Sequence, residues 1–355
     1  MKQIDWTGVR KVLVVRLRSI GDTVLATPSL IALRRFLPDA QVDILLEEWV
    51  APLLDGLDAV DNVIAVGAGR RSRISTMRRL RQERYDVVFN LHGGTTSTFF
   101  AAATGAPARI GWEEYQYSFL YTHLFPSSAD FWRRLVTHSA EQQLALLGFA
   151  GIPVEDKLRA SLAVTPQAQR SLEAKLRSKT DWTDGTDGRF ALIHPAAAFA
   201  TKEWPTENFA RLAGHLAARG LRTLAVAAKH ESTVLERLAA AAHVPIDVCD
   251  DLTLPEITAL ASRAMLFVGN DSGIAHIAAA VGTSSVVIFG SSNRDHWRPW
   301  TDAPNEIVFT PFACQPCPGY ECREFGTPNC ILAVTPESVI AAVDRVLASP
   351  VKNMN

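Results

Sequence analysis

The chain repeats one pattern twice, in which a short apolar run rich in valine, isoleucine and leucine is followed by a stretch with helical spacing. "KVLVVRL" (11–17) precedes an amphipathic segment that ends at Pro38, and "RFALIHP" (189–195) precedes the helical pattern of 206–220. Alternating strands and helices build parallel sheets covered on both faces. A length of 355 residues is enough for two such units. We therefore predict an α/β protein with two doubly wound, Rossmann-like parallel-sheet domains facing a cleft.

The polar segment "DWTDGTDG" (181–188) is the best linker candidate, because Asp-Gly pairs favour turns. It places a first domain at residues 1–180 and a second at 188–335. Residues 336–355 then form a C-terminal helix and tail that can pack back on the first domain. The predicted strands cover 11–17, 40–48, 62–67, 86–93, 108–112, 189–195, 221–228, 246–250, 265–271 and 284–290.

Composition excludes several classes of protein. The net charge is −1, so there is no electrostatic case for a nucleic-acid partner. No apolar run reaches the roughly 18 residues that span a bilayer, and the N-terminus has no small-residue cleavage site. Five cysteines in a chain of this length fit a reducing compartment better than a disulfide scaffold. We expect a cytoplasmic protein.

Two loops of the second half carry candidate ligand contacts, because ligands of open α/β sheets bind beyond the carboxyl ends of the strands. "HPAAAFATKEWP" (194–205) is rich in small residues and contains Thr201 and Lys202, which suit a phosphate. Taken alone, this loop is more often a plain surface loop. In "AAKHES" (227–232), Glu231 either accepts hydrogen bonds from ribose hydroxyls or is a charge favoured at a helix start.

A third segment, "GNDSGIAH" (269–276), opens a helix of small residues directly after a strand. The N–H groups at such a helix start favour an anion near Asp271, Ser272 and Gly273. Asp271 or Ser272 can equally be a helix cap and nothing more. His276 lies one turn into the helix, where a histidine is more often a packing residue than a functional one.

The first crossover, "RLRSIGDTVLATPSL" (16–30), has one glycine and one acid, Gly21 and Asp22, where a dinucleotide-binding protein has Gly-x-Gly-x-x-Gly. The same fingerprint is missing after the first strand of the second half, so an oxidoreductase that binds a dinucleotide is disfavoured. Asp22 is either an acid used in chemistry or a helix N-cap.

Five stretches of the chain point to one family. Four of them are "RLRSIGDTVLATPSLIALRRFLP" (16–38), "YDVVFNLHGGTTSTFFAAATGAPARIGW" (85–112), "HPAAAFATKEWPTENFARLA" (194–213) and "LPEITALASRAMLFVGNDSGIAHIAAAVGTSSVVIFG" (254–290), and the fifth is the cysteine-bearing segment near the C-terminus. Their order and spacing resemble the ADP-heptose:lipopolysaccharide heptosyltransferase family, glycosyltransferase family 9, over nearly the whole chain. The resemblance implies a GT-B fold and an inverting transfer of a heptose from ADP-heptose to the inner core of lipopolysaccharide. It implies neither a cofactor nor a catalytic metal.

The resemblance also implies roles for individual residues. Asp22 is the general base that takes the proton of the acceptor hydroxyl. The donor nucleotide is held by the second domain, with Thr201 and Lys202 at the diphosphate, Asp271, Ser272, Gly273 and His276 at the phosphate-binding helix start, and Glu231 at the ribose.

The implied acceptor is an anionic, lipid-linked sugar, and the first domain would bind it. Arg16, Arg18 and Arg109 are candidate ion-pair partners for its acidic groups, and Gly21 lies beside the base. The family's usual Asp-x-Gln-Gly is replaced by "NLHG" (90–93), which carries an asparagine and a histidine at the positions of the acid and the amide.

Two alternatives stay open at this point. A family-9 enzyme with another nucleotide-sugar donor or a non-lipopolysaccharide acceptor has the same motifs. A non-catalytic protein that binds a nucleotide sugar needs Lys202 and Asp271 but does not need Asp22.

Two further segments stand out. "RRSRISTMRRLRQER" (70–84) contains seven arginines, which form either a solvated helix face, the reading slightly favoured, or a surface that docks on an anionic inner-membrane leaflet. Four cysteines near the C-terminus have the spacing of a zinc or iron site, and a structural metal there is an open question. They are Cys314, Cys317, Cys322 and Cys330.

Overall fold

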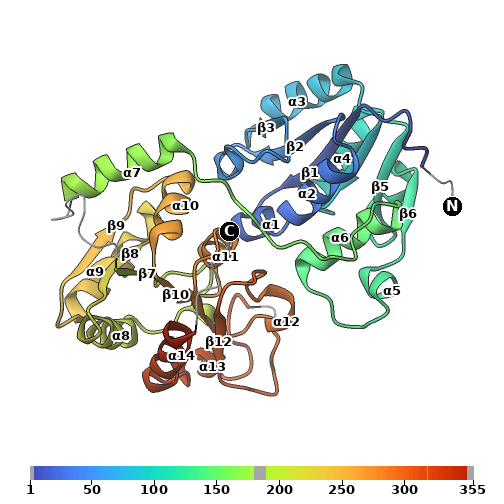
Figure 1. Ribbon diagram of the computed structural model, residues 1–355. Coiled ribbons are helices and arrows are strands. Elements are labelled where there is room, and N and C mark those ends of the chain that lie inside the picture. The colour runs from blue at the N-terminus through green and yellow to red at the C-terminus, as the bar shows by residue number, and fades with distance from the viewer. Residues whose placement is uncertain (1–3, 180–188, 318, 350–355) are drawn as a thin grey trace. The chain divides into compact units, whose positions relative to one another are not determined.

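The structure is a computed structural model that describes residues 4–179, 189–317 and 319–349. Contacts within the chain divide it into two compact units, Met1–Ala163 and Val164–Asn355. Each unit is built on a parallel β-sheet with helices on both faces, which confirms the predicted fold class (Figure 1). The predicted linker, 181–188, lies outside the described residues.

The first unit contains a sheet whose described strands run in the order β3-β2-β1-β4-β5-β6, all parallel. The order reverses between β1 and β4, where Val15 pairs with Asn90. The elements are β1 (Lys11–Leu17), α1 (Ile20–Val24), α2 (Thr27–Phe36), β2 (Gln41–Glu47), η1 (Ala51–Leu54), β3 (Asn62–Val66), α3 (Arg70–Glu83), β4 (Val87–Asn90), α4 (Thr95–Thr104), β5 (Ala108–Trp112), η2 (Ser118–Leu120), β6 (His123–Phe125), α5 (Ser128–Trp132) and α6 (Ser139–Phe149).

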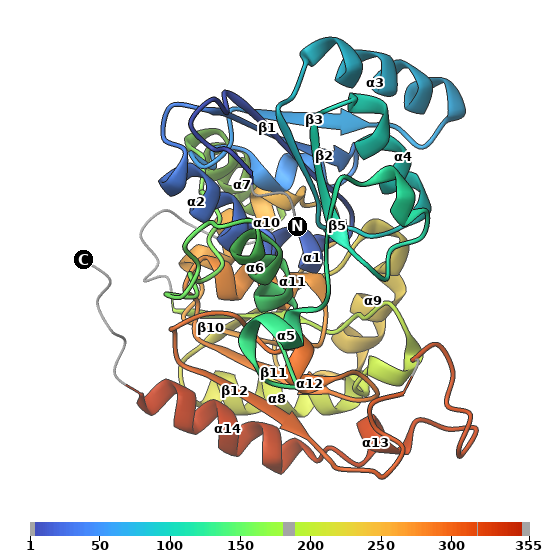
Figure 2. The same cartoon turned by 90° about the vertical axis from the view of Figure 1, so that its right-hand side faces the viewer.

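Helices cover both faces of this first sheet. Figure 2 shows α3 and α4 on one face and α2 and α6 on the other, and the members of each pair contact each other. The strands β1, β2 and β4 are buried along almost their whole length, as expected for the centre of a parallel sheet. One core cluster joins Leu13 of β1 to Leu80 of α3 and Phe100 of α4.

The second unit repeats this topology. Its described strands run in the order β12-β11-β10-β7-β8-β9, all parallel, so the order reverses between β7 and β10. The elements are α7 (Pro166–Lys179), β7 (Phe190–His194), η3 (Ala200–Lys202), α8 (Thr206–Ala218), β8 (Arg222–Val226), η4 (Lys229–Glu231), α9 (Ser232–Ala241), β9 (Ile246–Cys249), α10 (Leu254–Arg263), β10 (Leu266–Asn270), α11 (Gly273–Ala280), β11 (Ser285–Phe289), α12 (Arg294–Trp297), β12 (Asn305–Phe309), α13 (Asn329–Leu332) and α14 (Pro336–Ala348).

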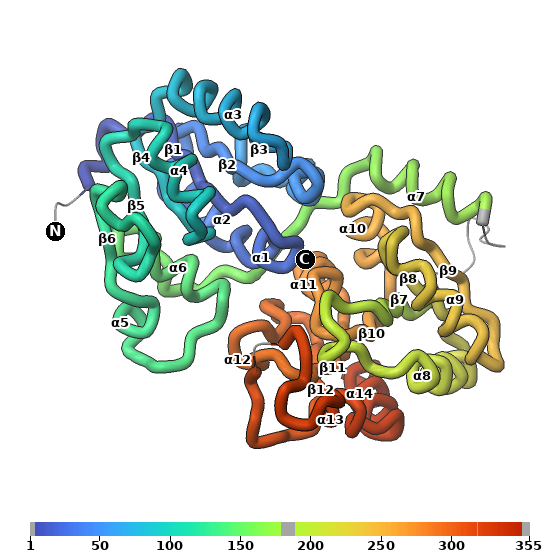
Figure 3. Tube along the Cα trace, turned by 180° about the vertical axis from the view of Figure 1, so that it is seen from behind, coloured from blue at the N-terminus to red at the C-terminus, as the bar shows by residue number. Residues whose placement is uncertain are grey.

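Much of the core of the second unit is built from the apolar face of the helix α8. In α8, Phe209, Leu212 and Leu216 recur every three or four residues and are fully buried against the sheet. The C-terminal helix α14 lies beside α8 and packs on β11 and β12 (Figure 3). Val339 and Val343 of α14 belong to the same core cluster as α8. The C-terminal helix therefore completes the second unit.

The helix α7 belongs to the second unit, so the boundary expected at residue 180 has to be corrected. Chain contacts place the division between Ala163 and Val164, and α7 packs on α10. Glu256 of α10 explains this position, because its buried carboxylate accepts hydrogen bonds from Ser171 at 2.6 Å and from Lys175 at 2.7 Å.

All the strands predicted from the sequence are present, and two more occur at sheet edges. The unpredicted strands are β6 and β12, which are short or only half-buried and lack a continuous apolar run. Among the residues that the structure describes, no helix has the length and apolar character needed to cross a membrane.

Candidate functional site

The candidate donor residues of the second unit gather where its strand order reverses. Lys202 follows β7, Asp271 follows β10, and these two strands are neighbours in the sheet. Ligands of doubly wound sheets bind at such a reversal, because the loops on either side diverge to opposite faces. The buried Asn270 fastens the loops together, since its side chain donates to the carbonyl of Pro195 at 2.7 Å and accepts from the backbone N–H of Trp204 at 3.1 Å.

Lys202 and Asp271 form an ion pair. The Lys202 Nζ lies 2.7 Å from Oδ2 of Asp271, and the same oxygen accepts a hydrogen bond from Ser292 at 2.5 Å. Asp271 is buried, so its charge is held by these two partners. A lysine ammonium has three N–H donors and uses one on Asp271, which leaves donors for a ligand anion.

The helix α11 begins at this point. Ser272 is its N-cap residue and Gly273 its first residue, so of the two cap candidates, Asp271 and Ser272, it is Ser272 that occupies this position. The Ser272 hydroxyl makes no cap bond and instead contacts Nδ1 of His194 at 3.1 Å. Burial lowers the pKa of His194 to about 4, so its imidazole is neutral at physiological pH. His276 is buried one turn further along α11.

Thr201 has a different environment from the one expected. Its side chain is buried, donates to the carbonyl of Gly319 and accepts from the Ser291 hydroxyl at 3.0 Å. A Cβ added at Gly290 would collide with the carbonyl of Thr201, so the loop after β11 packs directly on η3. The Thr201 hydroxyl therefore holds the cysteine-bearing loop in place, and Lys202 beside it is the more accessible of the two residues.

Glu231 ends η4, after β8. Its Oε2 accepts a hydrogen bond from the backbone N–H of Ala228 at 3.0 Å, as part of a capping arrangement. This bond uses one carboxylate oxygen of Glu231. It holds the side chain in the loop after β8, the strand that pairs with β7. The structure thus brings together Lys202, Asp271 and the start of α11, and places Glu231 one strand away.

In the first unit, Asp22 also lies after a central strand at the reversal point. It is the third residue of α1, not the N-cap, and its Oδ2 accepts from the Ser19 hydroxyl at 3.0 Å. Its Oδ1 forms a salt bridge with Arg16, whose side chain is buried. From the sequence, Arg16 was expected to pair with an acidic group of the acceptor. The guanidinium instead orients the Asp22 carboxylate.

The end of β4 completes this cluster. Arg16 also donates to the backbone carbonyl of Leu91, so one guanidinium joins Asp22 to the β4 loop. Asn90 is buried and accepts from the backbone N–H groups of His92 at 3.0 Å and Gly93 at 3.2 Å. The sequence assigned no structural role to Asn90, although a polar residue at the end of a buried strand was the available signal.

The three other acceptor candidates are not equally placed. Arg18 and Gly21 are close to Asp22 in the chain. Arg18 is exposed just before α1, and Gly21 is buried within α1. Arg109 is the second residue of β5 and donates to the carbonyls of Leu120 at 2.7 Å and Ala106 at 2.5 Å. Because the strands are parallel, the start of β5 lies at the opposite edge of the sheet from Asp22. The assignment of Arg109 to the acceptor site is therefore not supported.

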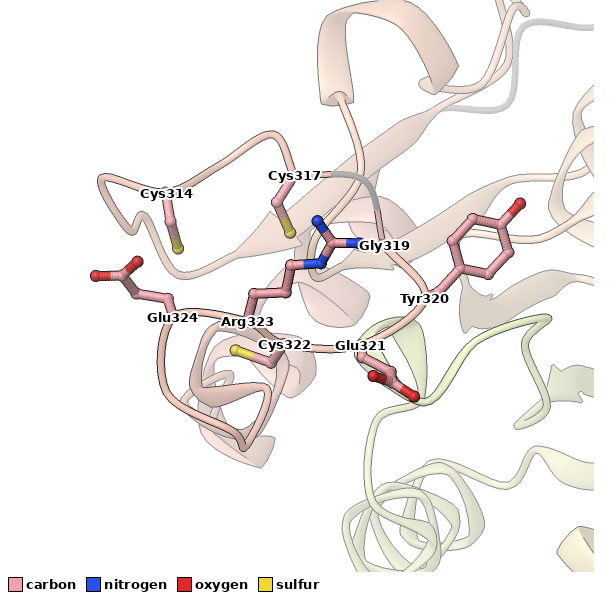
Figure 4. A pocket seen from close by; sticks show the side chains of 8 residues that line it. All are labelled: Cys314, Cys317, Gly319, Tyr320, Glu321, Cys322, Arg323 and Glu324. Carbon is pink, nitrogen blue, oxygen red and sulfur yellow. The ribbon is translucent and has the colours of Figure 1, made fainter.

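The four cysteines near the C-terminus surround one small region. Figure 4 shows Cys314, Cys317 and Cys322 lining a cavity of about 170 Å³, and Cys330 joins them at a smaller neighbouring cavity. All four thiols are free, and burial raises the pKa of Cys330. Within residues 4–179, 189–317 and 319–349, no three histidine, cysteine or acidic side chains are arranged to hold a metal ion.

The chain is similar to known proteins over most of its length. The family model of glycosyltransferase family 9 (heptosyltransferase) matches residues 73–327. Lipopolysaccharide heptosyltransferase 3 of Escherichia coli K12 is 30% identical over an alignment of 348 residues that covers 93% of this chain and 96% of that protein. Lipopolysaccharide heptosyltransferase 2 of Salmonella typhimurium LT2 is 27% identical over 301 residues, covering 81% of this chain and 85% of that protein.

Solved structures show the same fold. The glycosyl transferase family 9 protein of Veillonella parvula superposes with a TM-score of 0.82 at 20% identity, with 98% of each chain covered. The Escherichia coli heptosyltransferase WaaC with ADP-2-deoxy-2-fluoro heptose gives a TM-score of 0.69 at 20% identity, covering 94% of this chain and 99% of that one. The two Rossmann-like units are thus those of the GT-B fold.

Proposed function

Because the chain belongs to glycosyltransferase family 9, the heptosyltransferase family, we propose that it transfers a heptose from ADP-heptose to the inner core of lipopolysaccharide. Curated relatives of this chain are lipopolysaccharide heptosyltransferases, and one solved relative carries an ADP-heptose analogue. The observation that carries the proposal furthest is the Lys202–Asp271 pair beside the start of α11, at the reversal point of the second sheet.

The donor half of the proposal rests on charge. ADP leaves as an anion, so its negative charge grows as the bond to the sugar breaks. The ammonium of Lys202 and the N–H groups that begin at Gly273 stabilise that charge. Asp271 carries a negative charge itself and therefore holds Lys202 instead of touching phosphate. Glu231 retains a carboxylate oxygen that can accept from a ribose hydroxyl.

The acceptor half of the proposal rests on Asp22. An inverting transfer needs a base that takes the proton of the acceptor hydroxyl as its oxygen bonds to the anomeric carbon. Asp22 is oriented by its salt bridge with Arg16 and by the hydroxyl of Ser19, so its carboxylate is positioned for this role. The exposed Arg18 beside it can pair with an acidic group of the acceptor. A positioned base contributes about 10²–10⁴-fold to the rate.

A lipid-linked acceptor brings the enzyme to a membrane surface, so we also propose peripheral contact with an anionic leaflet through α3. The helix has exposed arginines along most of its length, among them Arg70, Arg71 and Arg78. Basic residues near an anionic bilayer gain about 1 kcal/mol each.

Transfer assays test the proposed function. Purified enzyme is incubated with ADP-heptose and a heptose-deficient lipopolysaccharide acceptor, and the product is detected by mass spectrometry. We expect heptose addition with release of ADP. Parallel reactions with other ADP- and UDP-sugars test the alternative donors, and transfer from one of these but not from ADP-heptose would reassign the donor. ADP-heptose binding without any transfer would favour a non-catalytic binding protein.

A further inference from the structure

Three aromatic side chains of the first unit, Phe99, Tyr117 and Phe119, lie exposed on its surface and contact one another. Phe99 comes from α4, and the other two come from the segment around η2, between β5 and β6. The ring centroids of Phe99 and Tyr117 are 5.4 Å apart, and those of Tyr117 and Phe119 are 6.3 Å apart. Phe99 is 43% exposed, Tyr117 44% and Phe119 79%. A contiguous group of exposed apolar side chains, which we call the aromatic cluster, is typical of an interaction surface.

The segment that carries two of these rings is held at both ends. Near its start, the hydroxyl of Thr95 in α4 donates to the side chain of Gln116 at 2.6 Å. Near its end, Arg109 donates to the carbonyl of Leu120 at 2.7 Å. Tyr117 has a φ of +58°, in the left-handed region that residues with side chains rarely adopt. The fold therefore keeps an aromatic side chain at a position where glycine would cost less.

The basic helix α3 lies next to the aromatic cluster. Since α3 and α4 pack together on the same face of the first sheet, their exposed side chains point away from it on the same side of the unit (Figure 2). The guanidinium of Arg81 in α3 lies against Gly105 at the end of α4, and its Nη1 is 3.4 Å from the carbonyl oxygen of Thr104. Residues 70–84 contain seven arginines and one acid, Glu83. The aromatic cluster thus borders a surface of positive charge.

We propose that the aromatic cluster is a membrane anchor, whose rings insert among the headgroups of an anionic bilayer while the arginines of α3 pair with the lipid phosphates. This inference deepens the proposed contact through α3 and rests on it. Charge attraction alone is reversible and screened by salt, so a second, apolar contact makes such binding stable. Aromatic rings are favoured at the headgroup level. An anionic leaflet is continuous and of one sign, which complements this surface better than a protein partner with charges of both signs.

The anchor is connected to the proposed acceptor site of the same unit. Tyr115, from the same segment, donates to the carbonyl of Asn90 at 3.1 Å, where β4 ends. The strand β4 pairs with β1, the strand that leads to Asp22. A bilayer that holds this segment therefore holds the proposed base close to the surface in which a lipid-linked acceptor lies.

Vesicle binding by Phe119→Ser and Phe119→Trp tests the inference. Co-sedimentation with phosphatidylglycerol vesicles is measured at low salt and at about 1 M salt, where the Debye length is only about 3 Å. We expect Phe119→Ser to bind about tenfold more weakly at both, the effect of leaving one partly inserted ring out of the bilayer. Phe119→Trp should bind at least as tightly as wild type, because tryptophan is favoured at the interface. Leu332→Ser removes an exposed apolar side chain of the second unit and should bind like wild type.

Transfer assays separate an anchor from a residue of the catalytic site. With the acceptor embedded in vesicles, Phe119→Ser should lose about tenfold in kcat/KM, in step with its weaker binding. With the same acceptor sugar freed of its lipid, the variant should match wild type, because the aromatic cluster then has nothing to bind. An equal loss with both acceptors would indicate a structural role and overturn the inference.

Three further outcomes would overturn it. One is binding of Phe119→Ser to vesicles with wild-type affinity. Another is weaker binding by Phe119→Trp, because only a contact of fixed shape rejects the larger ring. The third is self-association of wild type, detected by sedimentation velocity and lost in Phe119→Ser, which would assign the cluster to a contact between copies of the chain. Vesicle binding needs no sugar donor, so a wild-type enzyme that binds vesicles and transfers nothing contradicts the proposed transfer and supports the anchor.

Discussion

Lys202 and Asp271 meet across the reversal point of the second sheet, with 2.7 Å between Nζ and Oδ2. The lysine side chain is 17% exposed and the aspartate side chain 5%, so the pair has a buried anion and a cation that reaches the surface. Ser292 supplies the second bond to the same oxygen. This arrangement fixes the position of the ammonium before any ligand arrives, which is the basis of electrostatic preorganisation.

Replacing Lys202 with methionine should weaken donor binding and slow transfer. The substitution removes the charge that offsets the leaving diphosphate, so we expect turnover to fall about 10²-fold or more. It also removes the ion-pair partner of the buried Asp271 and leaves it the hydrogen bond from Ser292, at a cost of about 1–3 kcal/mol in unfolding free energy. ADP affinity is measured by calorimetry and stability by denaturant titration. Arg211→Met, at an exposed ion pair on α8, is the control. Unchanged ADP affinity would contradict the role of Lys202.

Replacing Asp22 with asparagine should separate catalysis from donor binding. The amide cannot take the proton, so transfer should fall about 10²–10⁴-fold. The affinity for ADP should not change, because the proposed nucleotide site belongs to the second unit. Arg16 loses its carboxylate partner, so a lower melting temperature is also expected. Asp39→Asn, at an exposed position of the same unit, controls for the loss of one acid. Transfer by Asp22→Asn at near wild-type rate would contradict the assignment of the base.

The central strands and the positions of Lys202, Asp271 and Asp22 could be predicted, because each depends on local signals. Buried parallel strands are recognised in a sequence as continuous apolar runs. Side chains that bind ligands lie in the loops that follow such strands. The partners of these residues could not be predicted. Lys202 and Asp271 lie 69 residues apart, so their pairing depends on the register of β7 with β10, which is set by packing between residues far apart in the sequence.

Two expectations depended on contacts that the sequence does not show. Arg109 is the second residue of the strand in both the prediction and the structure, but the sequence gives no sign that its side chain donates to the carbonyls of Leu120 and Ala106. The helix α7 looked like the end of the first domain, because the turn signals follow it. Its association with α10 depends on the contacts of Glu256 with Ser171 and Lys175, which are about 80 residues away.

Charge reversal on α3 should weaken binding to anionic vesicles. Arg70, Arg71 and Arg78 are exposed, glutamate is a good helix former, and acids are favoured in the first turn at Arg70 and Arg71, so changing all three to glutamate should leave the fold intact. We expect co-sedimentation with phosphatidylglycerol vesicles to fall at least tenfold and to be salt-sensitive in wild type. Reversal of the exposed Arg211 in the second unit is the control. Equal binding to neutral and anionic vesicles would exclude electrostatic docking.

Replacing Glu256 with glutamine should loosen α7. Burial raises the pKa of Glu256, but hydrogen bonds from Lys175, Ser171 and the backbone of Thr253 outweigh it and hold the pKa below its usual value. The ionised carboxylate therefore stabilises the unit at neutral pH, and this contribution is lost as the pH falls through that pKa. We expect the variant to lose about 1–3 kcal/mol in unfolding free energy. Glu337→Gln, at an exposed pair, should show no measurable change, and equal losses in both variants would contradict this account.

The buried His194 should make the stability of the second unit depend on pH. Its pKa is about 4 in the folded protein, against an ordinary value of 6.5, because burial disfavours the charged ring. Between these two values the unfolded chain binds more protons than the folded one, so stability falls as the pH is lowered from 6.5 towards 4. The full shift corresponds to about 3 kcal/mol.

The measurement is the difference in melting temperature between pH 7.5 and pH 5, in wild type and in His194→Gln. Glutamine does not titrate, so the variant should lose less stability on acidification than wild type does, even though it is less stable at pH 7.5. His243→Gln removes an exposed histidine of the same unit and should keep the wild-type difference. If His194→Gln and wild type lose the same number of degrees, the pH dependence arises from other groups, and His194 is not held neutral by the fold.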